Sequence, residues 1–438
     1  MDYKQTCEYL YSQMPMFEKQ GSAGYKEGLA NTIALDSHFG SPHRSYATIH
    51  VGGTNGKGSV SHSLAAILQT CGYRVGLYTS PHLVDFRERI RVNGIPISEE
   101  YVVDFVEQEK AFFEPLHPSF FEVTTAMAFK YFRDQNIDIA VIEVGLGGRL
   151  DCTNIITPIV SVITNISFDH TQFLGNTLAE IATEKAGIIK NNVPVVIGET
   201  TAETKPVFES RAKEQGAPIV FAESEPEVIE SELCDEGGMN YRTVSYGSIH
   251  GDLGGAYQTK NMNTVLAAVS VLAERGFLSN VRDGRNTDTF RQEINTALGS
   301  VAAMTGLMGR WQTVHKSPLV VCDTGHNVAG LEYVCKQLEK QKCNNLLMVF
   351  GMVDDKDIRS VIKLLPRNAK YFFTKAETKR AMNEIVVKTL AARDNIHGEA
   401  FPTVREAYNA AMEQANADDM IFVGGSSYVV GDFLRTCF

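Results

Sequence analysis

Short apolar runs alternate along this chain with longer segments of helical periodicity, and this alternation narrows the possible folds more than any other feature. Five runs in the first half predict buried strands, at residues 46–51, 74–80, 137–144, 159–166 and 193–198. Segments 59–72 and 121–135, which lie between these runs, carry helical patterns. Continuous apolar strands separated by helices are typical of a parallel sheet whose two faces are both covered.

The alternation is weaker between residues 200 and 250 and returns in the last third of the chain. Residues 255–276 predict a helix, and the glycine-bearing segment 298–310 predicts a linker. Four further apolar runs follow, at 319–325, 346–352, 370–376 and 419–425. Because 438 residues exceed one ordinary domain, we expect an α/β protein of two domains. The first, over residues 1–297, is a mostly parallel sheet domain of the phosphate-loop type, and the second, over residues 298–438, is a smaller Rossmann-like α/β domain.

The composition excludes several classes of protein. A net charge of −11 argues against a protein that wraps nucleic acid, although a local basic site could still bind small anions. No apolar stretch approaches the ~20 residues of a membrane span, and the first residues lack the pattern of a signal peptide. The eight cysteines include no C-x-x-C pair, so we expect reduced thiols in a cytoplasmic protein and no zinc site.

A glycine-rich stretch, GGTNGKGS, follows the first apolar run directly and precedes a helical pattern. It departs from the usual G-x-x-x-x-G-K-[ST] loop because Gly58 separates Lys57 from Ser59. Glycines allow backbone amides to approach an anion, the start of a helix adds partial positive charge, and Lys57 adds a full one. The alternative is a glycine-rich turn with a surface lysine. The combination favours a phosphate site.

Polar residues follow three other predicted strands. In open parallel sheets, ligands bind outside the carboxyl ends of the strands. Ser80, Glu143 and His170 stand at or just after such ends. Taken singly, Ser80 reads as a turn residue and His170 as a structural histidine, and Glu143 could pair with Arg149. A carboxylate in an apolar strand is costly unless it is paired or bound to a metal, so the group together favours a metal site.

Lys185 lies on the apolar side of a predicted helix over residues 177–190. Leu178, Ile181 and Ile188 form the apolar stripe, and Lys185 falls on it. An inward lysine would lose solvation, so its pKa would fall and its neutral amine would become reactive. The helical pattern alone instead favours a lysine whose stem covers apolar surface while its ammonium group reaches water.

The motifs of the chain, taken in order, resemble those of one family. They are HVGGTNGKGS, TSPHL with RERIRVNG, EVGLGGRLDCTN, ITNISFDH, EKAGIIK, GRWQ, DTGHN and GMVDDKD. This set resembles the Mur ligase superfamily of ATP-dependent amide-bond ligases, and within it folylpolyglutamate synthase and bifunctional dihydrofolate synthase/folylpolyglutamate synthase. The resemblance covers residues 47–430. Each motif alone is weak, whereas the ordered set is specific.

The resemblance implies a role for each matching position. Lys57, Lys185 and His326 match catalytic residues, and Lys185 matches a lysine that the family carbamylates. Positions implied for the nucleotide are Gly53, Thr54, Asn55, Gly56, Lys57, Gly58, Ser59, Asn165, Asn261, Arg310 and Asp323. Ser80, Glu143 and His170 match ligands of magnesium, of which we expect two ions, and a monovalent cation is also expected. Substrate positions are His82, Arg89, Phe121, Asp151 and Cys152, of which the last three match the lining of the pterin pocket.

The implied activity is ATP-dependent addition of L-glutamate to dihydropteroate, to the γ-carboxylate of tetrahydrofolate, or to both, through an acyl phosphate. The implied protein is a monomer that acts on small molecules, without nucleic-acid or membrane partners. The chain departs from the family pattern at Thr324-Gly325, where Gly-Ala is frequent, at Cys152, where Ala is frequent, and at Tyr257, where His is common. Three alternatives stay open: another Mur-type ligase, a phosphate-loop protein without ligase activity, and a small-molecule kinase.

Overall fold

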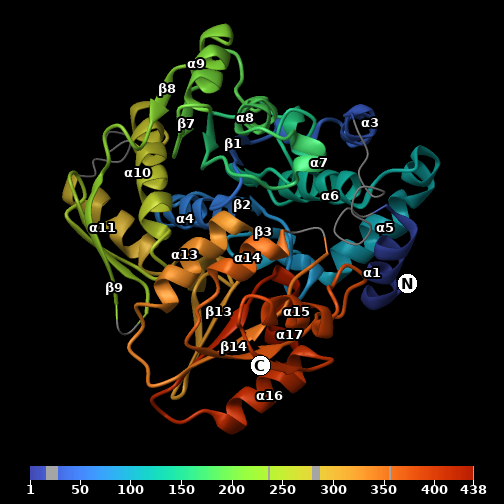
Figure 1. Cartoon of the computed structure of the whole chain (residues 1–438). Coiled ribbons are helices and arrows are strands. Elements are labelled where there is room, and N and C mark those ends of the chain that lie inside the picture. Colours follow the sequence, from blue (N-terminus) through green and yellow to red (C-terminus); the bar gives the residue numbers. More distant parts are fainter. Residues whose placement is uncertain (16–27, 235–236, 279–286, 355–356, 438) are drawn as a thin grey trace.

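The computed structural model describes residues 1–15, 28–234, 237–278, 287–354 and 357–437. The chain forms two α/β domains of unequal size that lie against each other. In the view of Figure 1 the first two thirds of the sequence lie above the last third. This arrangement agrees with the expected two-domain α/β fold. Among the helices of the described residues, none is long and apolar enough to cross a membrane.

The first domain contains an eight-stranded sheet in which the five predicted strands are all present. Its order is β4 (Ile95–Pro96), β3 (Ile90–Val92), β2 (Val75–Tyr78), β5 (Ile139–Glu143), β1 (Ala47–Gly52), β6 (Val160–Ile163), β7 (Val195–Ile197) and β8 (Ile219–Phe221). The six strands from β2 to β8 in this order are parallel, whereas β3 and β4 are antiparallel. All carboxyl ends of the parallel strands therefore meet at one edge.

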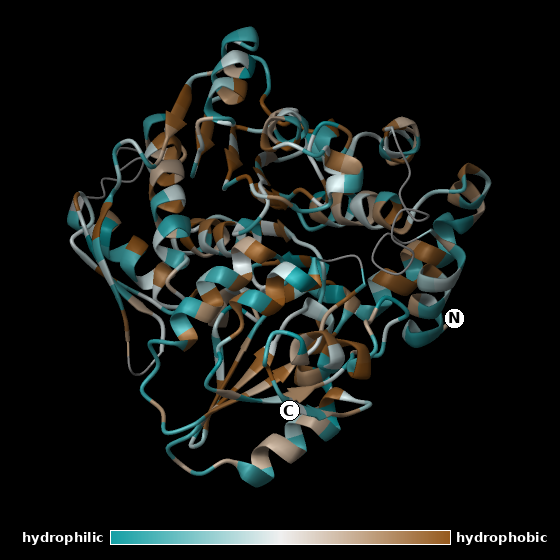
Figure 2. Ribbon diagram, in the orientation of Figure 1, coloured by the Kyte–Doolittle hydropathy of each residue, from teal (hydrophilic) through white to brown (hydrophobic). Residues whose placement is uncertain are grey.

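Helices cover both faces of this sheet because alternate strand residues point to opposite sides. On β5, Val141 packs in the cluster of α4 (Lys57–Thr70) and α10 (Gln258–Glu274), while Ile142 packs in that of α6 (Phe120–Asp134). Helices α1 (Tyr3–Gln13), α3 (Ala30–His38) and α5 (Glu99–Phe113) complete the second layer. Figure 2 shows mainly hydrophobic residues on the strands and the inner helix faces.

The segment between residues 200 and 250, which the sequence presents as irregular, is ordered. It contains α9 (Lys205–Glu214), β8 and a three-stranded antiparallel sheet of β9 (Val228–Leu233), β10 (Met239–Thr243) and β11 (Ser248–Gly251). On β10 the buried residues Met239, Tyr241 and Thr243 alternate with exposed ones. Such half-buried strands lack the continuous apolar run by which the other strands were predicted.

The second domain is a six-stranded sheet with helices on both faces. Its order is β12 (Gln312–Lys316), β13 (Leu319–Asp323), β17 (Met420–Gly424), β14 (Leu346–Phe350), β15 (Ala369–Phe373) and β16 (Gly398–Ala400), parallel except for β12. Helices α13 (Val328–Leu338), α14 (Ile358–Leu364) and α15 (Glu384–Ala392) cover one face, and α16 (Val404–Gln414) and α17 (Ser427–Cys437) cover the other.

Two predicted elements are shorter than the sequence patterns indicate. The predicted linker 298–310 contains α12 (Val301–Thr305), which packs on α4 together with α11 (Thr287–Leu298), so only residues 306–311 join the domains without regular structure. The division near residue 297 stays a prediction, and these contacts favour a boundary close to residue 306. The predicted helix 177–190 is α8 (Leu178–Ala186), which ends where the chain at Gly187 packs directly on Arg149.

Candidate active site between the two domains

The phosphate loop joins β1 to α4, and its glycines are required by space and by backbone conformation. Gly53 and Gly56 have φ of +135° and +87°, in the region that favours glycine. A Cβ on Gly53 would collide with Thr164 Oγ1, and one on Gly56 with Asn261 Oδ1. Helix α4 has no side-chain cap, so its first amides are available to an anion. The geometry therefore favours the phosphate-site interpretation over a turn with a surface lysine.

Neighbouring residues hold this loop in place. The Asn165 carbonyl accepts from Thr54 N at 2.9 Å, and Asn165 Oδ1 accepts from Asn55 N at 3.0 Å. Behind the loop, Gln258 Nε2 donates to Ser59 Oγ at 3.2 Å, and Asn261 Nδ2 donates to Gln258 Oε1 at 2.8 Å. Asn165, just after β6, and Asn261, on α10, thus support the loop.

Lys57 and Lys185 both lie at this loop, where Lys57 is half-buried and Lys185 is buried. Lys57 Nζ donates to the carbonyls of Gly53 and Thr54, each at 3.0 Å, and Lys185 Nζ donates to that of Gly53 at 2.9 Å. Only 5% of Lys185 is exposed, so the interpretation of a lysine that reaches water is wrong. Burial first, and then the nearby charge of Lys57, lower the pKa of Lys185 to about 7. A large part of its amine is neutral near pH 7.

Glu143 is a buried carboxylate at the end of β5. Its Oε2 accepts from Ser80 N at 3.2 Å. It forms no ion pair with Arg149, which pairs with Glu184 at 2.9 Å instead. Burial raises the pKa of Glu143, and the charge of Lys57 opposes that rise. The carboxylate therefore lies close to a cation without forming a salt bridge, as expected for a group that receives a metal ion.

Ser80, Glu143 and His170 line one cavity, which supports their grouping. Among the described residues, however, no three His, Cys, Asp or Glu side chains lie close enough to hold a metal ion by themselves. The assignment of Ser80, Glu143 and His170 as magnesium ligands stays a prediction. A magnesium ion held by these three residues would occupy an open half-site, completed by waters and phosphate oxygens, which magnesium binds as well as a few carboxylates.

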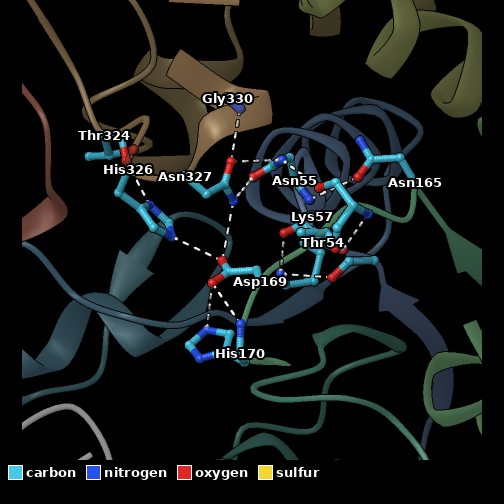
Figure 3. A network of polar contacts seen from close by, with 12 residues as sticks. Thr54, Asn55, Lys57, Asn165, Asp169, His170, Thr324, His326, Asn327 and Gly330 are labelled. Carbon is cyan, nitrogen blue, oxygen red and sulfur yellow. Dashed lines mark hydrogen bonds and ion pairs between the residues drawn. The ribbon is translucent and has the colours of Figure 1, made fainter. Parts of the chain in front are cut away.

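Asp169 joins the two domains, and the sequence analysis gave it no role (Figure 3). Its Oδ2 lies 3.4 Å from His326 Nε2 and accepts from Asn327 Nδ2 at 3.2 Å. Asn327 Nδ2 also donates to Asn55 Oδ1 at 2.9 Å. His326 Nδ1 donates to the Thr324 carbonyl at 3.0 Å, which directs Nε2 toward Asp169. The DTGHN motif of the second domain is therefore in contact with the phosphate loop.

Asp323 forms a second link between the domains. Its Oδ2 accepts from Tyr257 Oη at 2.6 Å and from Trp311 N at 2.8 Å, and its Oδ1 accepts from Gly325 N at 2.7 Å. Tyr257 precedes α10 of the first domain, whereas Asp323 ends β13 of the second. The tyrosine that departs from the family pattern thus contacts a predicted nucleotide residue.

The structure separates the predicted substrate residues into two groups. Phe121, Asp151 and Cys152 line the cavity. His82 and Arg89 are not part of that lining: Arg89 Nε donates to His82 Nδ1 at 2.7 Å, and the Arg89 guanidinium lies 5.1 Å from the Phe120 ring centroid. These two residues support the cavity wall from behind.

The whole cavity has a volume of about 290 Å³ and is lined by both domains. Predicted residues in its lining are Gly53, Thr54, Lys57, Gly58, Ser80, Phe121, Glu143, Asp151, Cys152, His170, Lys185, Arg310 and His326. Predicted residues that are not part of the lining are Asn55, Gly56, Ser59, His82, Arg89, Asn165, Asn261 and Asp323. Most of the predicted site is therefore brought together.

The second-domain wall contains residues that the sequence analysis missed. Ser426, Ser427 and Tyr428 line the cavity where β17 turns into α17, and Arg380 Nη1 donates to Tyr428 Oη at 3.1 Å. A glycine-rich strand-to-helix turn, GGSS, marks this position in the sequence and could have indicated it. Hydroxyls, a guanidinium and a helix start together favour an anionic ligand.

The cavity as a whole gathers Lys57, Arg91, Lys185, Arg310 and Arg380, against the carboxylates Glu88, Glu143, Asp151 and Asp169. Because Lys185 is largely neutral near pH 7, the four remaining cations balance the four carboxylates, and positive charge is concentrated here relative to a chain whose net charge is −11. A phosphate loop facing a second α/β domain across such a cavity defines a nucleotide-dependent enzyme of two domains, in which both domains contribute to one site.

Comparison with known proteins identifies the family. Residues 51–269 match the Mur ligase middle domain, and residues 309–427 match the glutamate ligase domain of Mur ligases. The dihydrofolate synthase/folylpolyglutamate synthase of Bacillus subtilis is 33% identical over 94% of this chain and 95% of its own length. The chain belongs to the Mur ligase family and, within it, to the dihydrofolate synthase/folylpolyglutamate synthase group.

Two solved structures share the whole fold. E. coli FolC in complex with DHPP and ADP superimposes with a TM-score of 0.83 and 29% identity, over 100% of this chain and 98% of that one. The second structure is the bifunctional folylpolyglutamate synthase/dihydrofolate synthase of Yersinia pestis with Mn, AMPPNP and L-glutamate bound. It superimposes with a TM-score of 0.79 and 26% identity, over 100% of this chain and 98% of that one.

Proposed function

We propose that this protein is an ATP-dependent ligase that joins L-glutamate to dihydropteroate and to the γ-carboxylate of tetrahydrofolate, with release of ADP and phosphate. The observation that carries the proposal is the single cavity between the domains, where a phosphate loop and a buried carboxylate face an anion-binding wall. A carboxylate does not react with an amine unaided, so it must first become an acyl phosphate. The glutamate amine then attacks the acyl carbon, and phosphate leaves.

The first domain supplies most of the groups for phosphoryl transfer, and the second domain adds Arg310. The amides at the start of α4, together with Lys57 and Arg310, bind the ATP phosphates. Arg310 reaches this position from the second domain, because its Nη2 would lie 3.1 Å from a Cβ on Gly58. Ser80, Glu143 and His170 would hold magnesium, which supplies charge neutralisation on the transferring phosphoryl group. The protein contributes mainly position and electrostatic stabilisation.

Lys185 is proposed to act as a carbamate. Its neutral amine would form an N–C bond to carbon dioxide and lose one proton, which converts a buried base into an anion. The pKa of about 7 and the enclosed position support this reaction. An anion there would accept from Lys57 and face the proposed magnesium half-site.

The second-domain wall is proposed to bind the incoming glutamate. Arg380, Ser427 and Tyr428 offer donors for its carboxylates, and His326 lies between that wall and Asp169. At the other end, Phe121 and Asp151 offer a ring and a buried carboxylate for the pterin. We also infer a monomer in the cytoplasm, with a monovalent cation as an additional ligand. Light scattering tests the monomer, and dependence of activity on potassium tests the cation.

Phosphate release from ATP tests the function. Purified protein is assayed with magnesium and L-glutamate, and with dihydropteroate or tetrahydrofolate in parallel. Release that requires glutamate and either acceptor supports the proposal, and dependence on both acceptors supports both activities. A stable phosphorylated product formed without glutamate would identify a kinase. Absence of release with either acceptor would refute the folate assignment, and muramyl substrates would then test the other Mur-type ligases.

A further inference from the structure

Arg91 is a buried cation on the cavity wall that the proposed chemistry does not use. It lies on β3 and is 4% exposed. Within the described residues no carboxylate pairs with it. Its Nη1 donates to the Glu88 carbonyl, its Nη2 donates to the Gly306 carbonyl at 3.2 Å, and its Nε is buried without a partner. A buried guanidinium without a counter-charge is costly, so a ligand that brings an anion would be favoured here.

The nearest carboxylate is already engaged. Glu88 Oε1 accepts from the amides of Val84 and Asp85, at 2.8 and 2.7 Å, and its Oε2 accepts from that of Leu83 at 2.8 Å. Three backbone donors thus hold this side chain in the turn before β3. Glu88 cannot turn to Arg91 without leaving these amides unpaired.

His62 on α4 lies at the same part of the cavity and offers a hydrogen-bond acceptor. Its Nδ1 lies 2.8 Å from Thr305 Oγ1, and the Thr305 hydroxyl donates its single proton to the Val301 carbonyl. His62 Nδ1 must therefore carry the proton in that contact, which leaves Nε2 as an acceptor. Burial, and then the charges of Arg91 and Arg310, hold the pKa of His62 well below its usual value, so the ring stays neutral.

A guanidinium beside a neutral acceptor matches one chemical group, a carboxylate next to a secondary amide N–H. Among the proposed substrates, tetrahydrofolate carries this group, because its glutamate is already joined through an amide. Dihydropteroate lacks it, since its only carboxylate is the one that reacts. We propose that Arg91 and His62 form a subsite for the existing glutamate of a folate acceptor, in which Arg91 binds the α-carboxylate and His62 Nε2 accepts the amide N–H.

This inference rests on the proposed function, and the two acceptors provide an internal control. Arg91→Met should raise KM for tetrahydrofolate on the order of 10- to 100-fold, and His62→Phe should raise it by less. KM for dihydropteroate should change less than about threefold in both, and Arg91→Lys should recover part of the loss because it keeps the charge. The matched control is Arg87→Met, an arginine that pairs with Asp85 at 3.0 Å outside the cavity. Equal losses with both acceptors would mean that Arg91 only fixes the linker at Gly306, and would overturn the subsite.

A binding measurement separates this inference from the ligase proposal. Calorimetry compares p-aminobenzoyl-L-glutamate with p-aminobenzoate, on the wild type and on Arg91→Met, each checked for an unchanged melting temperature. The wild type should prefer the acyl-glutamate, and Arg91→Met should lose this preference. Equal binding of both probes to the wild type would refute the subsite whether or not the protein is a ligase. If neither acceptor stimulates phosphate release but the wild type still prefers p-aminobenzoyl-L-glutamate, only the ligase proposal is refuted.

Discussion

Lys57 and Lys185 donate hydrogen bonds to the same oxygen, the carbonyl of Gly53, at 3.0 and 2.9 Å. Lys185 is buried and Lys57 is half-buried, and loss of solvation is the main cause that lowers the pKa of each. The two amines would repel each other if both were charged. Their closeness therefore favours one charged lysine, Lys57, for phosphate, and one neutral lysine, Lys185, for reaction with carbon dioxide.

Replacement of Lys57 should abolish ATP-dependent ligation while leaving the fold intact. Lys57→Ala removes the only full charge within the phosphate loop, so we expect a loss in kcat/KM of at least about 100-fold. Phosphate release measures the activity, and circular dichroism checks the fold. Lys336→Ala, which removes an exposed lysine paired with Glu332, is the matched control. Activity near that of the wild type in Lys57→Ala would mean that the loop does not bind phosphate.

Small carboxylic acids should restore part of the activity that is lost when the Lys185 amine is removed. Lys185→Ala should lose activity, and millimolar acetate or formate should restore part of it, because a small carboxylate can occupy the space of the carbamate. Mass spectrometry of the wild type under carbon dioxide should find the carbamate, which is lost on acidification. Absence of rescue, together with absence of the carbamate, would show that Lys185 acts as an amine.

The low pKa of Lys185 also predicts a stability that depends on pH. The amine titrates at about 7 in the folded protein, against an ordinary value of 10.5. Between these values the unfolded chain binds more protons, so the free energy of unfolding rises with pH in this window. In buffer free of carbon dioxide, Lys185→Met should exceed the wild type in stability at pH 6 by roughly 2–5 kcal/mol. Denaturant titrations should find this gap closing toward pH 10, and a constant gap would contradict the shift.

The sequence predicted the parts of the fold that follow from local patterns. The strands β1, β2, β5, β6 and β7 are continuous apolar runs, and all five are present. The strands β3 and β4 span three and two residues, which is too short for a periodic signal. The sheet β9–β11 was missed because its strands are half exposed. Burial on both faces, rather than strand formation itself, is what such patterns detect.

The candidate site, like the fold, contains parts that local motifs predict and parts that depend on tertiary contacts. The phosphate loop and the strand ends were predicted because each is a short motif with its own chemistry. Asp169 and Asn327 were not, since 158 residues separate them and only the packing of the domains brings them into contact. The helical pattern placed Lys185 on the inner side of α8, but the burial of its amine depends on the Gly53 carbonyl that it meets, which a helical pattern does not contain. The roles of individual residues follow from tertiary contacts.

Asn327 has two separable roles that its variants should resolve. Its Oδ1 caps α13 by accepting from Gly330 N at 2.8 Å and also accepts from Asn55 Nδ2 at 3.3 Å, while its Nδ2 donates across the domains to Asn55 and Asp169. Asn327→Ser should keep the cap and lose the two Nδ2 contacts between domains, whereas Asn327→Ala should lose the cap as well. We expect about a 10-fold loss of kcat/KM in each, and about 1 kcal/mol lower stability only in Asn327→Ala. Equal stability of the two variants would show that the cap is unimportant.

His50 should position Asp151 through Thr153. His50 Nε2 lies 2.8 Å from Thr153 Oγ1, and that hydroxyl donates to Asp151 Oδ1. Because the hydroxyl has one proton, His50 must donate from Nε2, and its Nδ1 is indeed buried without a partner. Burial lowers the pKa of His50 to about 3, so the ring is neutral at working pH.

Nitrogen NMR should therefore find the Nε2–H tautomer of His50, unchanged as the pH falls from 8 to 5. His50→Phe should raise KM for dihydropteroate about 3- to 10-fold, because the Thr153 hydroxyl would lose the donor that directs its proton to Asp151, whose carboxylate would then be held mainly by the amides of Leu146 and Thr153, while KM for ATP should stay constant. His50→Gln retains a donor and should recover much of the effect. Titration near pH 6.5, or an equal change in both KM values, would mean that His50 supports the core without directing Asp151.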